Sequence, residues 1–246
     1  MAVAPTGSIL TDRRLEENMA GVDNDGHHWR TVILVAAPAA LLVALVAHPY
    51  LSGRLPNDTE VAAAVASGTT RWGLVHLATS VASGLIILAF LAVRSYLREA
   101  GEDRFSALGV PLVVMGSTLF AVLPGMEFAP LAAAETGATT AEIVATQEAL
   151  SSWFMPVLVS GALAFAIGVF AFARALSVTT PGGRALTRVV VVALIVLAIS
   201  RFVPLAAVQF YVQGGAAIVA LWPLAYAMRT QPAPYGASRS RPMRAG

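Results

Sequence analysis

The chain has 246 residues, of which 57% are hydrophobic and only 12% are charged, and its formal net charge is +2. A typical soluble domain is about 25% charged, so a single soluble core cannot absorb this much apolar sequence. Cysteine is absent, which excludes disulfides, thiolate metal sites, iron–sulfur clusters and a cysteine nucleophile. Lysine is absent too, a bias typical of GC-rich genomes, and its absence excludes Schiff-base chemistry.

Uncharged apolar runs along the chain predict an all-α, polytopic integral membrane protein. Residues 1–29 are polar and carry both signs of charge, so we predict a disordered cytoplasmic tail there. About 20 apolar residues suffice for a helix to cross a bilayer. The apolar stretches within residues 30–229 therefore predict a transmembrane domain of six helices. The expected spans lie near residues 31–51, 72–93, 106–126, 152–173, 186–204 and 208–228. Pro204 separates the last two spans. A second disordered cytoplasmic tail is expected at residues 230–246.

The distribution of arginine predicts the orientation of these spans. Of the 16 cationic residues, only Arg54, Arg71 and Arg201 fall on one side of the predicted membrane. Since cationic residues beside short loops are retained in the cytoplasm, both termini are expected there, in the cell membrane. The same clustering accounts for the basic charge, so nucleic acid is not expected as a partner.

The segment 139–151, just before the fourth span, predicts a helix. Thr139 and Glu142 have the spacing of a capping box, in which each side chain bonds the other residue's backbone N–H. This helix would then place Ile143, Val144 and Leu150 against the membrane surface and would cover the outer ends of the spans.

Uncommon polar residues near membrane depth are informative, because their burial costs free energy unless a partner or a wet cavity compensates. In the predicted topology they gather in the outer third and indicate an outward-facing pocket. The residues expected to bind a ligand are Arg201, Gln209, Gln213, Tyr211 and Trp72. Arg201 could receive a carboxylate or a phosphate, and the alternative is that its side chain snorkels to the interface.

His48 and His76 lie on consecutive antiparallel spans at similar depth and leave three alternatives open. They are ordinary packing residues, or they ligate a haem iron axially, or they bind a metal such as zinc together with Glu127. Axial haem ligation requires their two ring nitrogens to lie about 4 Å apart across the iron. No cofactor is favoured over none.

No phosphate-binding loop, HExxH, GxSxG or Rossmann fingerprint occurs in the sequence, so binding is favoured over catalysis. We predict a multi-pass protein that binds a small ligand or ion, as a transporter-like protein, a sensor or an accessory subunit. The alternatives are a haem-binding redox protein and a metal-dependent membrane enzyme. Expected partners are the lipid bilayer and a small molecule or ion from the outer side; a membrane-protein partner or a second copy of the chain is left open.

Overall fold

The computed structural model describes residues 8–230, with side chains from His28 onward, and within this range it contains helices but no strand. In chain order the elements are α1 (Ser8–Ala47), α2 (Asp58–Ser67), α3 (Thr69–Glu99), α4 (Arg104–Met126), α5 (Phe128–Glu135), α6 (Thr140–Thr179), α7 (Arg184–Ser200), the π-helix η1 (Ala207–Val212) and α8 (Gln213–Thr230). The all-helical class is therefore confirmed.

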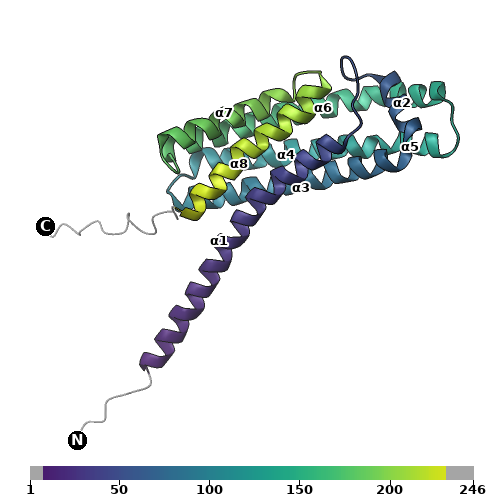
Figure 1. The fold of residues 1–246 in the computed structure, drawn as a ribbon. Coiled ribbons are helices and arrows are strands. Elements are labelled where there is room, and N and C mark those ends of the chain that lie inside the picture. Colours follow the sequence, from purple (N-terminus) through teal and green to yellow (C-terminus); the bar gives the residue numbers. More distant parts are fainter. Residues whose placement is uncertain (1–7, 231–246) are drawn as a thin grey trace, which may run out of the picture.

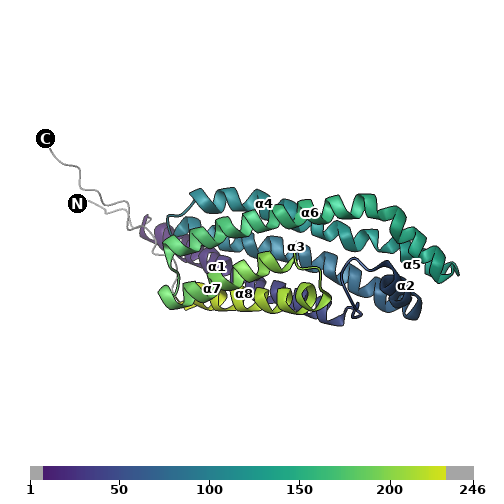
Figure 2. The ribbon, with the colours of Figure 1, turned by 90° about the horizontal axis from the view of Figure 1, so that it is seen from above.

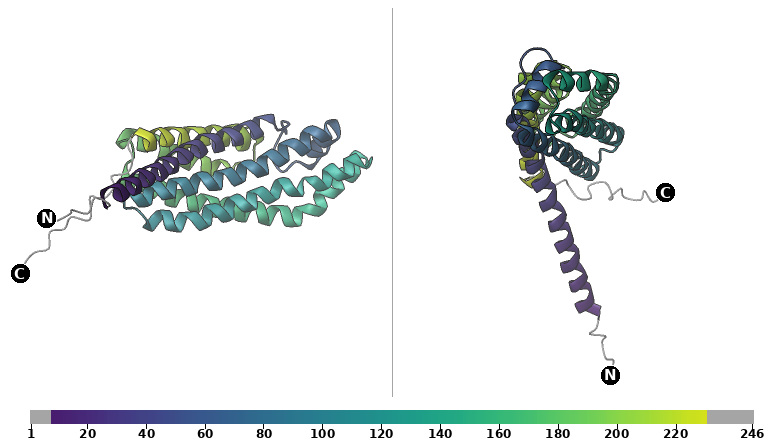
Figure 3. Two further views of the ribbon diagram at one scale, coloured as in Figure 1. Left: turned by 90° about the horizontal axis from the view of Figure 1, so that it is seen from below. Right: turned by 90° about the vertical axis from the view of Figure 1, so that its right-hand side faces the viewer.

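The long helices run side by side and form a closed ring in the order of the sequence. α1, α3, α4, α6, α7 and α8 each pack on the next, and α8 closes against α1 (Figures 1 and 3). The short helices α2 and α5 gather at the end of the bundle remote from the C-terminal end of α8 (Figure 2). The centre of the ring is filled by apolar side chains, among them Phe90, Phe165 and Phe172.

The composition of the helices is that of a membrane-embedded protein. Five are long and apolar enough to cross a bilayer: His28–Ala47, Thr69–Glu99, Arg104–Glu135, Thr140–Thr179 and Ala207–Thr230. Their outer surfaces expose large apolar side chains, for example Val43 at 68% and Leu74 at 62%. Exposed apolar surface on this scale is suited to lipid.

The six-span count and the orientation stay predictions. The predicted span 186–204 corresponds to α7, which has 17 residues and is not among the five. At the N-terminus, α1 is helical from Ser8, so it runs through most of the segment for which a disordered tail is predicted. The outer parts of both predicted tails, residues 1–7 and 231–246, lie outside the described residues.

The capping box before the fourth span is confirmed. The Thr139 hydroxyl accepts from the Glu142 backbone N–H, and the Glu142 carboxylate accepts from the Thr139 backbone N–H at 2.7 Å. The helix that starts here is continuous with the predicted fourth span, because α6 runs for 40 residues from Thr140 to Thr179. Ile143 is only 1% exposed, so the prediction that it lies against the membrane surface is wrong, because this turn of α6 packs inside the protein.

α4 and α6 approach each other closely through glycines. A Cβ atom added at Gly116 would lie 2.5 Å from the backbone nitrogen of Phe165, and one at Gly168 would lie 2.7 Å from that of Val113. Real Cβ atoms do not come so near to a backbone, so these positions require glycine. The contact places Phe165 at the centre of the ring.

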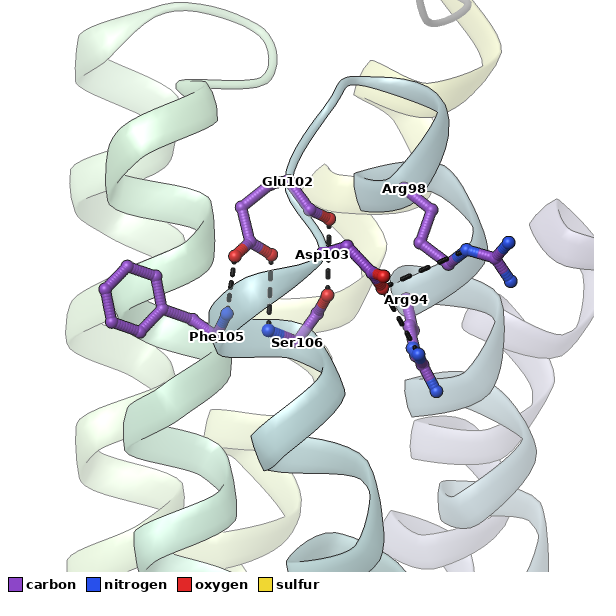
Figure 4. A network of polar contacts seen from close by, with 6 residues as sticks. All are labelled: Arg94, Arg98, Glu102, Asp103, Phe105 and Ser106. Carbon is purple, nitrogen blue, oxygen red and sulfur yellow. Dashed lines mark hydrogen bonds and ion pairs between the residues drawn. The ribbon is translucent and has the colours of Figure 1, made fainter.

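The turn between α3 and α4 closes the end of the bundle opposite α2 and α5. The buried Glu102 carboxylate accepts hydrogen bonds from the backbone N–H groups of Phe105 at 2.6 Å and Ser106 at 3.2 Å (Figure 4). It thereby satisfies two of the free donors at the start of α4. Asp103 forms an ion pair with Arg94 of α3 at 3.2 Å, which ties the turn back to the preceding helix.

The glycine contact can be tested by adding one methyl group. Gly116→Ala should lower the free energy of unfolding by about 1–3 kcal/mol, because the new Cβ meets backbone that cannot rotate away. The matched control is Gly84→Ala in α3, where nothing lies within 4 Å and the change should be neutral or mildly stabilising. Thermal unfolding of the purified protein in detergent measures both. Equal melting temperatures of the two variants would contradict the close approach of α4 and α6.

Candidate functional site

A cavity of about 520 Å³ lies at the end of the bundle that carries α2 and α5. Its walls come from α1, α2, α3, α4, α6 and η1, from the first residue of α8, and from the loops that follow α1 and α7. On one side the loop after α1 is joined to the loop after α7, since the Leu55 backbone N–H donates to the Pro204 carbonyl at 3.0 Å. The size is that of a small-molecule site.

Most of the residues singled out in the sequence line this one cavity. These are His48, Trp72, His76, Glu127, Arg201, Gln209 and Gln213. Tyr211 does not line it and is 41% exposed. Gln147 lines it as well and was missed by sequence reasoning. The available signal was its position four residues after Ile143, on the same face of a helix.

Arg201 follows the last residue of α7 and is only 5% exposed. Its guanidinium carbon lies 3.7 Å from the ring centre of Phe120 and 3.6 Å from that of Phe165, so the cation sits between two aromatic rings. Nε and Nη1 are buried without a hydrogen-bond partner. No carboxylate forms an ion pair with this guanidinium in the part of the chain that the structure describes. The side chain therefore stays inside the bundle and does not snorkel.

Gln209 and Gln213 reach the cavity from the start of the last helix. Gln209 lies in the π-helix η1, whose wider turns are frequent at functional sites. Its Nε2 is 3.5 Å from the Arg201 carbonyl oxygen, and Gln213 is only 5% exposed. Two amides thus line the cavity that also contains the buried guanidinium.

The two histidines meet. Their Nε2 atoms are 3.4 Å apart, while His48 Nδ1 lies 2.7 Å from the Pro49 carbonyl oxygen and His76 Nδ1 lies 2.7 Å from the Trp72 carbonyl oxygen. Aromatic rings surround the pair, with the Trp72 centroid 4.3 Å from that of His76 and the Phe210 centroid 4.5 Å from that of His48.

This geometry does not fit either cofactor arrangement considered for the sequence. Axial ligation would place the two nitrogens about 4 Å apart with a porphyrin between the rings. The rings instead contact each other edge to face at an interplanar angle of 66°, which leaves no space for a porphyrin between them. Glu127 does not complete a metal site either, because among the described residues no three His, Cys, Asp or Glu side chains converge.

Glu127 has a structural role at the rim of the cavity. Its Oε2 accepts a hydrogen bond from Gln147 Nε2 at 2.8 Å, and its backbone carbonyl accepts one from Trp72 Nε1 at 3.3 Å. The end of α4 is thereby linked to α6 and to α3. These bonds hold Trp72, which is 1% exposed, in place beside the histidines.

In comparisons with known proteins, no family model matches the sequence, and no curated protein or solved structure is similar to it.

The Glu127 link can be tested by removing its donor. Gln147→Leu should lower the free energy of unfolding by about 1–3 kcal/mol, because the carboxylate is left without its hydrogen bond. The double variant Glu127→Leu/Gln147→Leu should recover part of that loss, since an apolar pair leaves no unsatisfied group. Denaturant or thermal unfolding in detergent measures both. The single variant Glu127→Leu completes the comparison. If the double variant loses as much stability as the two single variants together, the two side chains do not interact.

Proposed function

We propose that this protein is a six-span membrane protein, with both termini in the cytoplasm, that binds an amphiphilic carboxylate in the cavity from the outer side. The observation that carries the proposal is the buried Arg201 guanidinium, which has no counter-ion among the described residues. Binding of this kind suits a transporter-like protein, a sensor or an accessory subunit.

The support for six spans comes from α7. Its 17 residues extend over about 25 Å at 1.5 Å per residue, near the lower limit for crossing a bilayer. It packs lengthwise between α6 and α8, as a full member of the ring. Arg184 and Arg188 lie at its start and Arg201 follows its end, which is the pattern of a helix with polar ends and an apolar middle.

The buried positive charge of Arg201 favours an anion as the ligand. A buried cation without a partner costs several kcal/mol, and the two aromatic rings offset only part of that cost. A carboxylate in the cavity would supply the missing charge. Nε and Nη1 of Arg201 are covered by protein, so Nη2 is the nitrogen through which a cavity ligand can reach the cation. The amides of Gln209 and Gln213 can donate to the same group.

The side chains that line the cavity indicate which kind of body the ligand has beside its charged group. Apart from Arg201 and the other polar residues that line it, the cavity has mainly apolar and aromatic walls, including Leu45, Ile86, Leu158 and Phe210. Such walls favour an apolar body, and aromatic surfaces favour an aryl group. An arylalkyl carboxylate combines both features, and 4-phenylbutyrate is a suitable probe.

The proposal predicts charge-dependent binding. The protein in lipid nanodiscs should bind 4-phenylbutyrate in equilibrium dialysis and should bind the neutral 4-phenylbutanol much more weakly. Arg201→Gln should weaken binding of the acid by at least about tenfold, which corresponds to about 1.4 kcal/mol. The matched control is Arg188→Gln, an exposed arginine at the other end of α7, which should bind like the unmodified protein. An Arg201→Gln variant that binds the acid normally would refute the proposal.

The topology can be tested with single cysteines, because the natural chain has none. Ala185→Cys at the start of α7 should be protected from a membrane-impermeant maleimide in intact cells. Leu205→Cys, beyond the end of α7, should be labelled. Both positions are exposed in the structure, so burial does not confuse the result. Labelling of both cysteines from the same side would show that α7 does not cross.

A further inference from the structure

We propose that His48 and His76 form a binding site for a first-row transition-metal ion of the zinc class, held between their two Nε2 atoms. The proposal is independent of the proposed carboxylate, because Arg201 takes no part in it. The hydrogen bonds of the two rings, the distance between their nitrogens and their position at the cavity support this site.

The hydrogen bonds determine which nitrogen of each ring carries the proton. Both Nδ1 atoms lie 2.7 Å from backbone carbonyl oxygens, those of Pro49 and Trp72. A carbonyl oxygen can only accept, so each neutral ring must place its proton on Nδ1. Each Nε2 then carries a lone pair. This is the arrangement of metal-binding histidines, whose second ring nitrogen almost always donates to a carbonyl or a carboxylate.

The two lone pairs face each other. With both protons on Nδ1, neither ring has an Nε2 proton to donate, and two acceptors at 3.4 Å repel each other. A proton shared between the rings is a poor remedy, because 3.4 Å is longer than the roughly 2.7–3.2 Å of protein N–H hydrogen bonds. A cation between the nitrogens would turn the repulsion into coordination.

The distance fits a tetrahedral ion. Zinc binds histidine nitrogen at about 2.0–2.1 Å, and two such bonds at the tetrahedral angle place the nitrogens about 3.3–3.4 Å apart. The observed separation is 3.4 Å. A trans arrangement would require about 4 Å, so the geometry favours neighbouring positions on one ion.

The remaining coordination positions belong to the cavity. Both histidines are buried and line it, and no third His, Cys, Asp or Glu joins them among the described residues. Trp72 and Phe210 cover the pair but supply no strong ligand. The ion would therefore complete its shell with water or with a ligand from the cavity. With two protein ligands, the site has fewer than the three of catalytic zinc sites and the four of structural ones, so two positions would be open to water or to a ligand.

The test uses the full chain, purified without a polyhistidine tag and stripped of metal. Zinc titration against a competing chelator should show one ion per chain. Cobalt(II) as a spectroscopic probe should give the intense visible bands of tetrahedral coordination. His48→Gln and His76→Gln should each weaken zinc binding by at least about tenfold and abolish the tetrahedral cobalt spectrum. Thermal unfolding and gel filtration of each variant establish that it is folded.

His28→Gln is the matched control, because His28 is an exposed histidine on α1 outside the cavity, and this variant should bind zinc normally. Arg201→Gln should also keep its zinc affinity, which separates this proposal from the carboxylate site. No zinc binding, an octahedral cobalt spectrum, or unchanged zinc affinity in folded His48→Gln and His76→Gln would each overturn the proposal.

Discussion

The contact between the backbones of α4 and α6 is the constraint on which the cavity depends. Because Gly116 has no side chain, Phe165 can come against it and its ring can point into the centre of the bundle. That ring and the ring of Phe120 hold the Arg201 guanidinium on its two faces. A packing feature in the middle of the membrane domain therefore positions a charge at the cavity. The position of Arg201 depends on helices other than its own.

Two chemically different groups share the cavity. The guanidinium of Arg201 carries a positive charge, whereas the Nε2 atoms of His48 and His76 face each other with lone pairs. Both groups lie among mainly apolar and aromatic side chains, where electrostatic interactions are stronger than in bulk water. This combination of charge and apolar surface is the basis for the proposed ligand, which carries a charged group on an otherwise apolar body.

Hydrogen bonds link the helix ends around these groups. Glu127 links the ends of three helices through its two hydrogen bonds and holds Trp72 beside the histidines. η1 is itself a wider helical turn, and Gln209 and Phe210 enter the cavity from it. In a membrane, such a departure from regular helix is tolerated where the backbone borders protein or a cavity, because lipid cannot satisfy free backbone groups.

By itself, the sequence determined the helical class, the apolar helices and the capping box at Thr139, because hydropathy and capping patterns are local properties. It singled out several polar residues that line the cavity, but it included Tyr211, which does not, and missed Gln147, which does. It also led to errors of the same local kind, such as placing Ile143 at the membrane surface. The tertiary structure alone decided that Arg201 lies between two rings and that the histidine nitrogens face each other at 3.4 Å. The rotation and depth of each helix determine these contacts, and both depend on packing between residues that are distant in sequence.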